Sequence, residues 1–232
     1  HDRMKINKHA CSLQDCFLCR HCSKEWLPAL AAHRKNFQVA KGEVLFHEGD
    51  AMKGIWFVYR GRFKVHKKWG TEKELIVRLA RDGDILGHRG MGGDLYYPVS
   101  ATALEPSRVC YVDLEFFMAT LKVNPPLLME LMQFFAAELK ESEKRMRNLA
   151  HMPVIGRVAG SLLTLSEKFG TTPDGFINMT LSRQDLAAYT GTTYETVFRV
   201  LNELAAANAI SYSGKNIKIL DEALLKRHMR ED

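Results

Sequence analysis

Residues 181–210, LSRQDLAAYTGTTYETVFRVLNELAAANAI, constrain the fold more than any other part of the chain. Ser182 and Asp185 have the spacing of a capping box, which predicts that a helix begins there. Gly191 offers the backbone freedom that a sharp turn after this helix requires. One of the two threonines that follow can then cap a second helix. Two short helices that meet at a tight turn form a helix-turn-helix.

The second helix is expected to have two different faces. Its apolar residues at helical spacing should face the core: Val197, Val200, Leu201 and Leu204. The opposite side, near the helix start, carries Tyr194, Glu195, Phe198 and Arg199. Glu195 and Arg199 are four residues apart, so they share one face and can form an ion pair. In a DNA major groove, Arg199 could bond guanine bidentately while Glu195 accepts from cytosine, although an isolated pair would more simply be a surface salt bridge.

A short β-hairpin is expected directly after this helix. Residues 211–213 and 217–219 alternate like strands on either side of a turn at 214–216. A hairpin in this position is a wing, and the capped helix, glycine turn, outward Glu and Arg, and wing together predict DNA binding. The net charge of +6 adds little, because residues 154–232 contain equal numbers of basic and acidic side chains. Affinity for phosphates therefore depends on local placement of basic residues such as Lys215.

The segment SRQDLAAYTGTTYETVFRVLNEL resembles the recognition module of the CRP/FNR family of bacterial transcription regulators. The matching positions are Ser182-Arg183-Gln184, Gly191, Glu195-Thr196-Val197 and Arg199. The resemblance implies that Glu195 and Arg199 read a TGA-like half-site in palindromic double-stranded DNA, and that RNA polymerase is a partner. It also implies that phosphates are contacted by Arg183, Gln184 and Thr193. Tyr194 and Phe198 depart from the best-known members, so their base contacts do not follow from the resemblance.

Four cysteines are clustered near the start of the chain: Cys11, Cys16, Cys19 and Cys22. With Cys110 the total is five, and an odd number in a reducing compartment disfavours a disulfide framework. The spacing suits a zinc ion or an iron-sulfur cluster, and the alternative is a tail with spectator thiols. The oxygen-sensing FNR branch of the family holds a [4Fe-4S] cluster with three N-terminal cysteines and a distant one, which Cys110 resembles. By its own pattern, Cys110 is equally a small apolar residue of a buried strand.

Residues 37–114 alternate like short strands broken by glycines, which predicts a jelly-roll barrel. The stretches KGEVLFHEGD and DGDILG resemble the β-roll of cyclic-nucleotide-binding domains. Family members that bind cyclic nucleotides carry a Glu directly after the glycine of a phosphate-binding turn, the cassette turn, and an Arg-Ser pair further on. Here the cassette turn is residues 87–92 and the later site is residues 96–100, and both the Glu and the Arg-Ser pair are missing. Their absence argues against cyclic AMP. A different small ligand is left open, with this candidate effector pocket: Gly87, His88, Arg89, Tyr97 and Ser100. Arg89 is expected at the loop surface, and His88 is expected to be solvated or hydrogen-bonded.

A long helix is expected after Asn124-Pro125-Pro126, because proline favours the first turn of a helix. Its apolar stripe comprises Leu128, Leu131, Phe135, Leu139, Met146 and Leu149. A parallel coiled coil would bury this stripe and produce a homodimer, which matches two recognition helices on a palindromic site. Residues 151–153 are predicted to form a hinge, since Pro153 blocks continuation of the helix.

We therefore expect an α+β protein with an N-terminal double-stranded β-helix, a long dimerisation helix and a C-terminal winged helix-turn-helix. The expected parts are a cysteine-rich segment (1–27), an effector-sensing β-roll (28–120), the helix and hinge (121–152) and the DNA-binding domain (153–232). No apolar run is long enough to cross a bilayer, so a cytoplasmic protein without membrane contact is expected. The sequence shows no arrangement of a nucleophile and a neighbouring base, so an enzyme is not expected. The alternative function is a ligand- or metal-binding sensor that acts through protein partners.

Overall fold

The structure is a computed structural model that describes residues 5–6 and 14–230. The chain divides into two compact units. One unit extends to residue 139 without residues 70–76, and the other comprises residues 70–76 and the chain from residue 140 onward. Both helices and sheets are present, as the α+β expectation requires. None of the described helices is long and apolar enough to cross a membrane.

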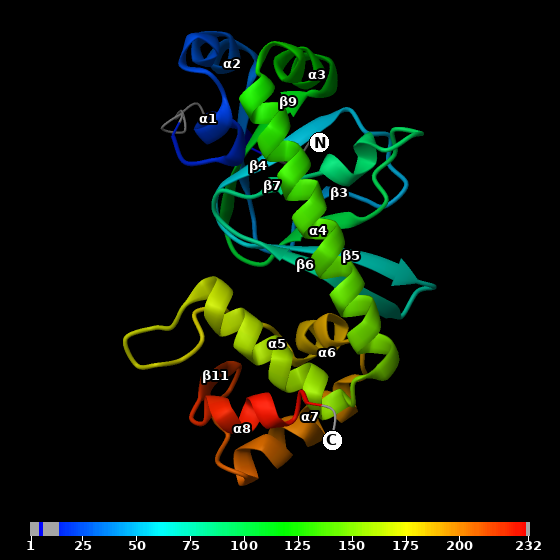
Figure 1. Ribbon diagram of the computed structural model, residues 1–232, viewed down its shortest axis with the longest axis vertical. Helices are drawn as coiled ribbons and strands as arrows, with labels where there is room; N and C mark the ends of the chain where they lie inside the picture. Colours follow the sequence, from blue (N-terminus) through cyan, green and yellow to red (C-terminus); the bar gives the residue numbers. More distant parts are fainter. Residues whose placement is uncertain (1–4, 7–13, 231–232) are drawn as a thin grey trace. The chain divides into compact units, whose positions relative to one another are not determined.

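The first unit is a β-roll built from two sheets (Figure 1). Its strands are β1 (Lys5–Ile6), β2 (Lys35–Val39), β3 (Val44–Phe46), β4 (Gly54–Arg60), β5 (Phe63–Trp69), β6 (Lys73–Ala80), β7 (Ile85–Leu86), β8 (Ser100–Ala103) and β9 (Ser107–Asp113). One sheet has the strand order β1-β2-β9-β4-β7, and the other has the order β3-β8-β5-β6. The predicted jelly-roll is therefore confirmed.

Strand β4 lies at the centre of the core because both of its faces are buried. Residues 54–58 are all buried, including the large side chains of Trp56 and Phe57. A strand covered on both sides has a continuous apolar run rather than an alternating pattern. β4 pairs antiparallel with β9, which places Phe57 opposite Cys110. Cys110 is 1% exposed and thus occupies the interior of the roll, as its strand pattern indicates.

The helical segments of the first unit are α1 (Phe17–His21), the 3-10 turn η1 (Lys24–Trp26), α2 (Leu27–His33), the 3-10 turn η2 (His88–Met91) and α3 (Leu114–Val123). Helix α4 (Pro125–His151) belongs to the first unit up to residue 139 and to the second unit from residue 140. A buried asparagine between α3 and α4 fixes the N-terminal segment. The Asn124 side-chain oxygen accepts from Ser23 N at 2.9 Å and lies 3.5 Å from Cys22 Sγ. Its amide nitrogen donates to Thr120 O at 2.8 Å, so both ends of the side chain are bonded. Trp26 adds a hydrogen bond to Thr120 Oγ1 at 3.0 Å.

Helix α4 begins at Pro125 as predicted, but its apolar residues divide between two sides. Leu127 and Leu131 are buried against the core of the roll, at 0% and 2% exposure. The expected stripe was therefore wrong at Leu131. A second row remains exposed or half-buried and follows the alternating spacing of three and four residues that coiled coils use: Leu128, Met132, Phe135, Leu139, Met146 and Leu149. We call these six residues the α4 seam.

The second unit contains α5 (Val154–Phe169), α6 (Arg183–Thr190), α7 (Tyr194–Ala206), β10 (Ile210–Ser213), β11 (Asn216–Ile219) and α8 (Glu222–Arg227). β10 and β11 pair antiparallel, with Tyr212 opposite Ile217. The core of this unit is aliphatic and includes Val158 and Leu162 of α5, Leu201 of α7 and Leu225 of α8. Three helices and a hairpin in this order form a winged helix-turn-helix, as the sequence predicts.

Candidate nucleic-acid interface

The two helices of the helix-turn-helix begin and turn at the predicted residues. Ser182 Oγ accepts from Asp185 N at 2.9 Å and donates to the Asp185 carboxylate at 2.7 Å, which satisfies an otherwise unpaired donor of α6. Gly191 has φ +68°, a left-handed conformation that glycine adopts without strain. Of the two candidate threonines, Thr193 is the cap of α7 and accepts from Thr196 N. These local contacts fix the angle at which α7 starts.

Helix α7 has the two faces that its sequence predicts. Val197, Val200, Leu201 and Leu204 are at most 1% exposed. The opposite face carries Tyr194, Glu195, Phe198 and Arg199, which are all exposed. The burial of one aliphatic face therefore holds the polar and aromatic side chains toward the outside of the unit. This outward face is the candidate nucleic-acid interface.

The ion pair on this face differs from the expected one. Arg199 Nη1 lies 3.6 Å from Glu203 Oε2, one helical turn toward the C-terminus, and no pair of Arg199 with Glu195 occurs among residues 14–230. The two side chains of this pair are 69% and 55% exposed, so it contributes little to stability. Glu195 is exposed on the same face. Spacing alone could not distinguish the two glutamates, because each is four residues from Arg199.

A residue of α6, Arg183, contacts the wing. Arg183 Nη2 donates to Gly214 O at 2.7 Å, and its guanidinium lies over the Tyr212 ring at 5.0 Å from the centroid. Tyr212 Oη in turn donates to the Asn202 side chain on α7. Arg183, which is expected to contact phosphate, thus also holds the wing turn through one of its nitrogens. Lys215 at the tip of that turn is exposed.

The remaining residues expected at phosphates lie at the edges of the same face. Gln184 is exposed in the first turn of α6, and Thr193 is exposed at the cap of α7. The structure therefore brings the predicted DNA-binding residues onto one side of α6, α7 and the wing, all within one unit. Whether each contacts DNA stays a prediction.

One arginine joins the last turn of α4 to the turn between α6 and α7. Arg157 on α5 donates from Nη1 to Leu149 O at 3.0 Å and from Nη2 to Gly191 O at 3.3 Å. Carbonyls at helix C-termini lack partners within the helix, and a cation there is favourable. No local sequence motif marks Arg157 for this role.

The residues of the candidate effector pocket are packed rather than lining open space. Tyr97 is 4% exposed, stacks on Phe46 at 4.0 Å and donates from its hydroxyl to Gly54 O at 2.7 Å. Ser100 Oγ accepts from Glu48 N at 2.9 Å. A Cβ atom at Gly87 would lie 3.0 Å from the Tyr97 ring, which explains a glycine at this point. Tyr97 thus fills the space next to the cassette turn.

His88 and Arg89 are not solvated loop residues, contrary to expectation. His88 is 3% exposed and lies between the rings of Phe134 and Phe135 on α4, with centroid distances of 5.0 and 5.4 Å. Arg89 Nη2 lies 2.8 Å from Glu138 Oε2 on α4. The turn after Gly87 is instead covered by α4, a tertiary contact that sequence spacing does not encode.

Glu138 is the centre of this charged cluster. Its carboxylate also lies 3.3 Å from Arg78 Nε and 3.8 Å from His88 Nε2. Burial acts to raise the pKa of Glu138, but His88, Arg78 and Arg89 together bring it well below its usual range. For His88 the opposite holds, because burial lowers its pKa from 6.5 to about 4. His88 is therefore neutral at neutral pH.

The lowered pKa of His88 predicts a loss of stability in mild acid. Between pH 6.5 and about 4 the unfolded chain binds a proton at this histidine that the folded chain does not, so stability falls as pH falls. The expected contribution between pH 6.5 and 5 is about 1.5 kcal/mol in the free energy of unfolding. Urea unfolding at both pH values measures it. His88→Gln should remove that part of the pH dependence, whereas His47→Gln, at an exposed histidine, should keep it. If the free energy of unfolding depends on pH equally in wild type and His88→Gln, the lowered pKa of His88 is wrong.

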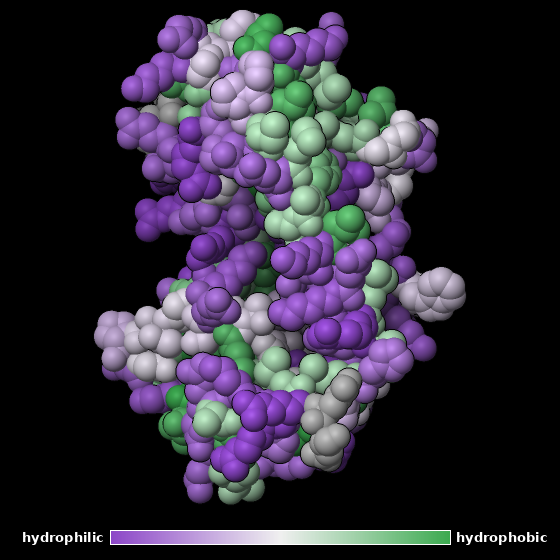
Figure 2. Space-filling view, viewed as in Figure 1, coloured by the Kyte–Doolittle hydropathy of each residue, from purple (hydrophilic) through white to green (hydrophobic). Residues whose placement is uncertain are grey.

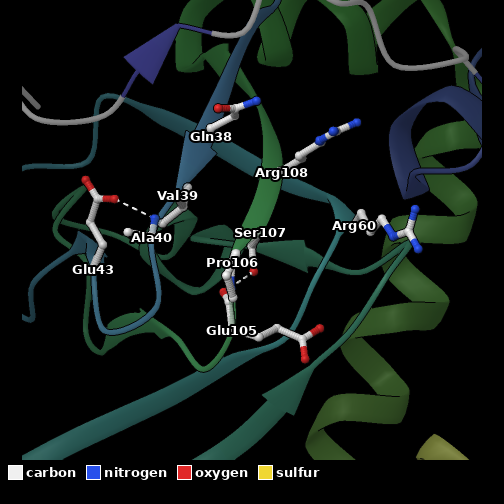
Figure 3. Close-up of a pocket in the computed structure, with 9 residues that line it drawn as sticks. All are labelled: Gln38, Val39, Ala40, Glu43, Arg60, Glu105, Pro106, Ser107 and Arg108. Carbon is white, nitrogen blue, oxygen red and sulfur yellow. Dashed lines mark hydrogen bonds between the residues drawn. The ribbon is translucent and has the colours of Figure 1, made fainter.

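A pocket of about 620 Å³ lies elsewhere on the β-roll (Figure 3). Its lining residues are Gln38, Val39, Ala40, Glu43, Arg60, Glu105, Pro106, Ser107 and Arg108. Ala40 N donates to the Glu43 carboxylate, and Ser107 Oγ donates to Glu105 O, so part of the rim is internally bonded. None of the candidate effector residues contributes to this pocket.

The N-terminal cysteines are only partly brought together. Cys16 and Cys19 are buried with their sulfurs 3.3 Å apart, whereas Cys22 is directed to Asn124 and Cys110 lies in β9. Cys11 lies outside the described residues. Within residues 14–230, no three His, Cys, Asp or Glu side chains are grouped so as to hold a metal ion. The described residues therefore do not form the ligand set that a zinc ion or an iron-sulfur cluster would need.

A β-roll, a long helix and a winged helix-turn-helix with an exposed recognition face define the class of effector-domain DNA-binding regulators. Residues 36–124 match the family described as cyclic nucleotide-binding domain, and residues 156–228 match the Crp-like helix-turn-helix domain. The chain is 32% identical over 181 residues to the cAMP-activated global transcriptional regulator CRP of Salmonella typhimurium, covering 75% of this chain and 84% of that protein. The chain therefore belongs to the CRP/FNR family of DNA-binding transcription regulators.

Two further comparisons cover more of the chain. The fumarate and nitrate reduction regulatory protein of Vibrio cholerae is 28% identical over 234 residues, covering 95% of this chain and 92% of the relative. The solved structure of FixK2 from Bradyrhizobium japonicum superposes with a TM-score of 0.76 at 22% identity, covering 86% of this chain and 98% of FixK2. The likeness to FixK2 concerns the fold.

Proposed function

We propose that this protein is a homodimeric regulator of transcription that binds a palindromic DNA site with TGA-like half-sites and is switched by an effector. The observation that carries the proposal is the outward face of α7, where Glu195 and Arg199 lie exposed over a fully buried aliphatic face. A helix with buried support and an exposed polar row near its N-terminus is the element that helix-turn-helix proteins insert into the major groove.

Each of the two polar residues has a defined task in base recognition. Arg199 offers two parallel N–H donors, which match the O6 and N7 acceptors of guanine. Glu195 is acceptor-only and suits the amino group of cytosine. Glu203 keeps the Arg199 side chain along the helix surface in the unbound protein, at 3.6 Å. We infer that Arg199 exchanges this weak pair for guanine when DNA binds, since exposed ion pairs contribute at most about 1 kcal/mol.

Phosphate contacts position the recognition helix. Gln184 at the start of α6, Thr193 at the start of α7 and Lys215 on the wing flank the recognition face and suit the two DNA backbones on either side of the groove. Backbone N–H groups at the two helix starts add to this attraction for phosphate. We assign Arg183 to the wing instead of to phosphate, because it already donates to Gly214 O and lies over Tyr212.

The proposed homodimer rests on the α4 seam. Four of its residues, Leu128, Met132, Leu139 and Met146, are between 42% and 60% exposed. Figure 2 shows apolar residues gathered along the part of α4 that covers the β-roll. Apolar side chains at coiled-coil spacing on a 27-residue helix suit a second copy of the same helix. A two-fold dimer presents two α7 helices, which matches a palindromic site.

We propose that the effector acts on the first unit and shifts the population of dimers that fit the operator. The chemical nature of the effector is not assigned: the iron-sulfur cluster and zinc find no complete ligand set in residues 14–230, and Tyr97 occupies the space beside the cassette turn. RNA polymerase, by family resemblance, is the proposed partner on the promoter. No step of the proposed mechanism is catalytic.

Selection from a random duplex library tests the proposal. The purified protein is incubated with the library, bound duplexes are recovered and sequenced, and their affinity is measured by fluorescence anisotropy. We expect an inverted repeat with TGA in each half, one helical turn apart, and an affinity that falls steeply with added salt. Recovery of no enriched sequence at any salt concentration would contradict DNA regulation and favour a sensor that acts through protein partners.

A further inference from the structure

Two aromatic side chains stand on the recognition face without any role in the core. Tyr194 and Phe198 are 49% and 48% exposed, whereas the aliphatic residues on the opposite side of α7 are buried. The two aromatics are four residues apart, so they are neighbours on the helix surface. Phenylalanine has no polar atom to offer water, and an exposed aromatic ring leaves apolar surface uncovered.

Phe198 lies among the residues that the proposed function assigns to base reading. Arg199 follows it directly, and Glu195 precedes it by one helical turn. Asn202, one turn further on, is held by the Tyr212 hydroxyl of the wing. The Phe198 ring is therefore exposed on the same outward face of α7 as the two polar readers. A partner that covers Glu195 and Arg199 also covers Phe198.

The major groove offers a matching apolar group. Among the four bases only thymine presents a methyl group there, and phenylalanine is one of the side chains that contact it. Resting on the proposed DNA-binding function, we propose that Phe198 is a specificity-determining residue that packs against the 5-methyl group of a thymine next to the guanine read by Arg199. Tyr194, one turn before it, narrows the space around that methyl group from the side of the helix start.

This assignment gives a thymine of the expected TGA-like half-site its own reader. Glu195 and Arg199 account for a C·G pair, while Phe198 adds a demand for thymine at a neighbouring position, on either strand. The recognition of thymine is purely apolar, so it depends on one methyl group and on no hydrogen bond. Removal of that methyl group leaves base pairing unchanged, so its effect on binding can be measured without altering the hydrogen bonds of Glu195 and Arg199.

The test replaces thymine by deoxyuridine, which lacks the methyl group. Each thymine of the selected duplex is replaced in turn, at both half-sites, and the dissociation constant is measured by fluorescence anisotropy at fixed salt. We expect one position to weaken wild-type binding by roughly tenfold or more, because burial of one methyl group contributes about a factor of four per half-site. For Phe198→Ala, thymine and deoxyuridine duplexes should bind equally at that position.

Two further variants make the result interpretable. Phe198→Leu retains an apolar side chain and should retain part of the preference for thymine. Leu220→Ala removes an equally exposed apolar side chain from the same unit but outside α7, and it should respond to deoxyuridine as wild type does. Alanine at an exposed helix position keeps the helix, which circular dichroism and thermal unfolding verify.

The outcomes separate this inference from the function on which it rests. If wild-type protein selects a palindrome but no deoxyuridine substitution affects it differently from Phe198→Ala, the thymine contact is wrong while DNA regulation stands. A preference for thymine that persists in Phe198→Ala would likewise overturn it and point to another residue. If no duplex is selected at all, both the function and the inference fail.

Discussion

Arg199→Ala is expected to abolish specific DNA binding without unfolding the protein. One bidentate contact to guanine contributes about 1–3 kcal/mol of discrimination, and a dimer makes it twice. The combined loss of about 2–6 kcal/mol corresponds to roughly a thirtyfold to twenty-thousandfold increase in the dissociation constant. The side chain is 69% exposed and its pair with Glu203 contributes little to stability, so the melting temperature should hardly change. Fluorescence anisotropy with the selected duplex measures the loss.

A control separates base reading from general charge. Lys226→Ala also removes one positive charge from the same unit, but on α8, which is not part of the helix-turn-helix or the wing strands, where Lys226 pairs with Glu222. This variant should bind the operator within a few-fold of wild type. Glu195→Ala should bind with reduced discrimination at the C·G pair. Unchanged affinity in Arg199→Ala would overturn the assignment of α7 as the recognition helix.

Leu139→Glu is expected to convert the protein to a monomer that no longer binds the palindrome. Leu139 is 60% exposed in the isolated chain and lies in the middle of the α4 seam. Burying one leucine side chain contributes about 1.5–3 kcal/mol, and the dimer loses two of them while gaining two facing carboxylates. Sedimentation velocity and light scattering report the mass, and anisotropy reports the loss of DNA binding.

The matched control for this variant is Ala137→Glu. Ala137 is exposed on the same helix two residues earlier, off the seam, so the added carboxylate should leave the dimer intact. Both substitutions keep a good helix-forming residue. If Leu139→Glu stays dimeric at micromolar concentration, the seam is not the dimer interface.

Local chemistry explains what the sequence could predict. Ser182, Gly191 and Thr193 act through contacts within four residues, so capping and turn patterns place the helix-turn-helix correctly. The same holds for the split of α7 into a buried and an exposed face, because helical periodicity alone decides it. The strands of the roll follow from their apolar runs and glycine breaks.

Tertiary contacts explain the features that the sequence could not predict. His88 was expected to be solvated or hydrogen-bonded on a loop, but it is buried against Phe134 and Phe135, which lie far along the chain on α4. Leu131 and Met132 are both apolar neighbours, and only the position of the roll decides that Leu131 is buried while Met132 is 58% exposed. Arg183 donates to Gly214 O of the wing turn, a contact that its local sequence pattern does not encode, and its predicted phosphate contact stays a prediction.

The two hydrogen bonds of Arg157 have a mechanical consequence for signalling. One guanidinium holds a carbonyl from the end of α4 and a carbonyl from the turn that aims α7. If that end of α4 rotates, one of the two hydrogen bonds lengthens unless the turn moves with it. Arg157 therefore couples the end of α4 to the turn between α6 and α7. In the proposed switch, a movement of the end of α4 would therefore need to pass through only one side chain to reach the turn before α7.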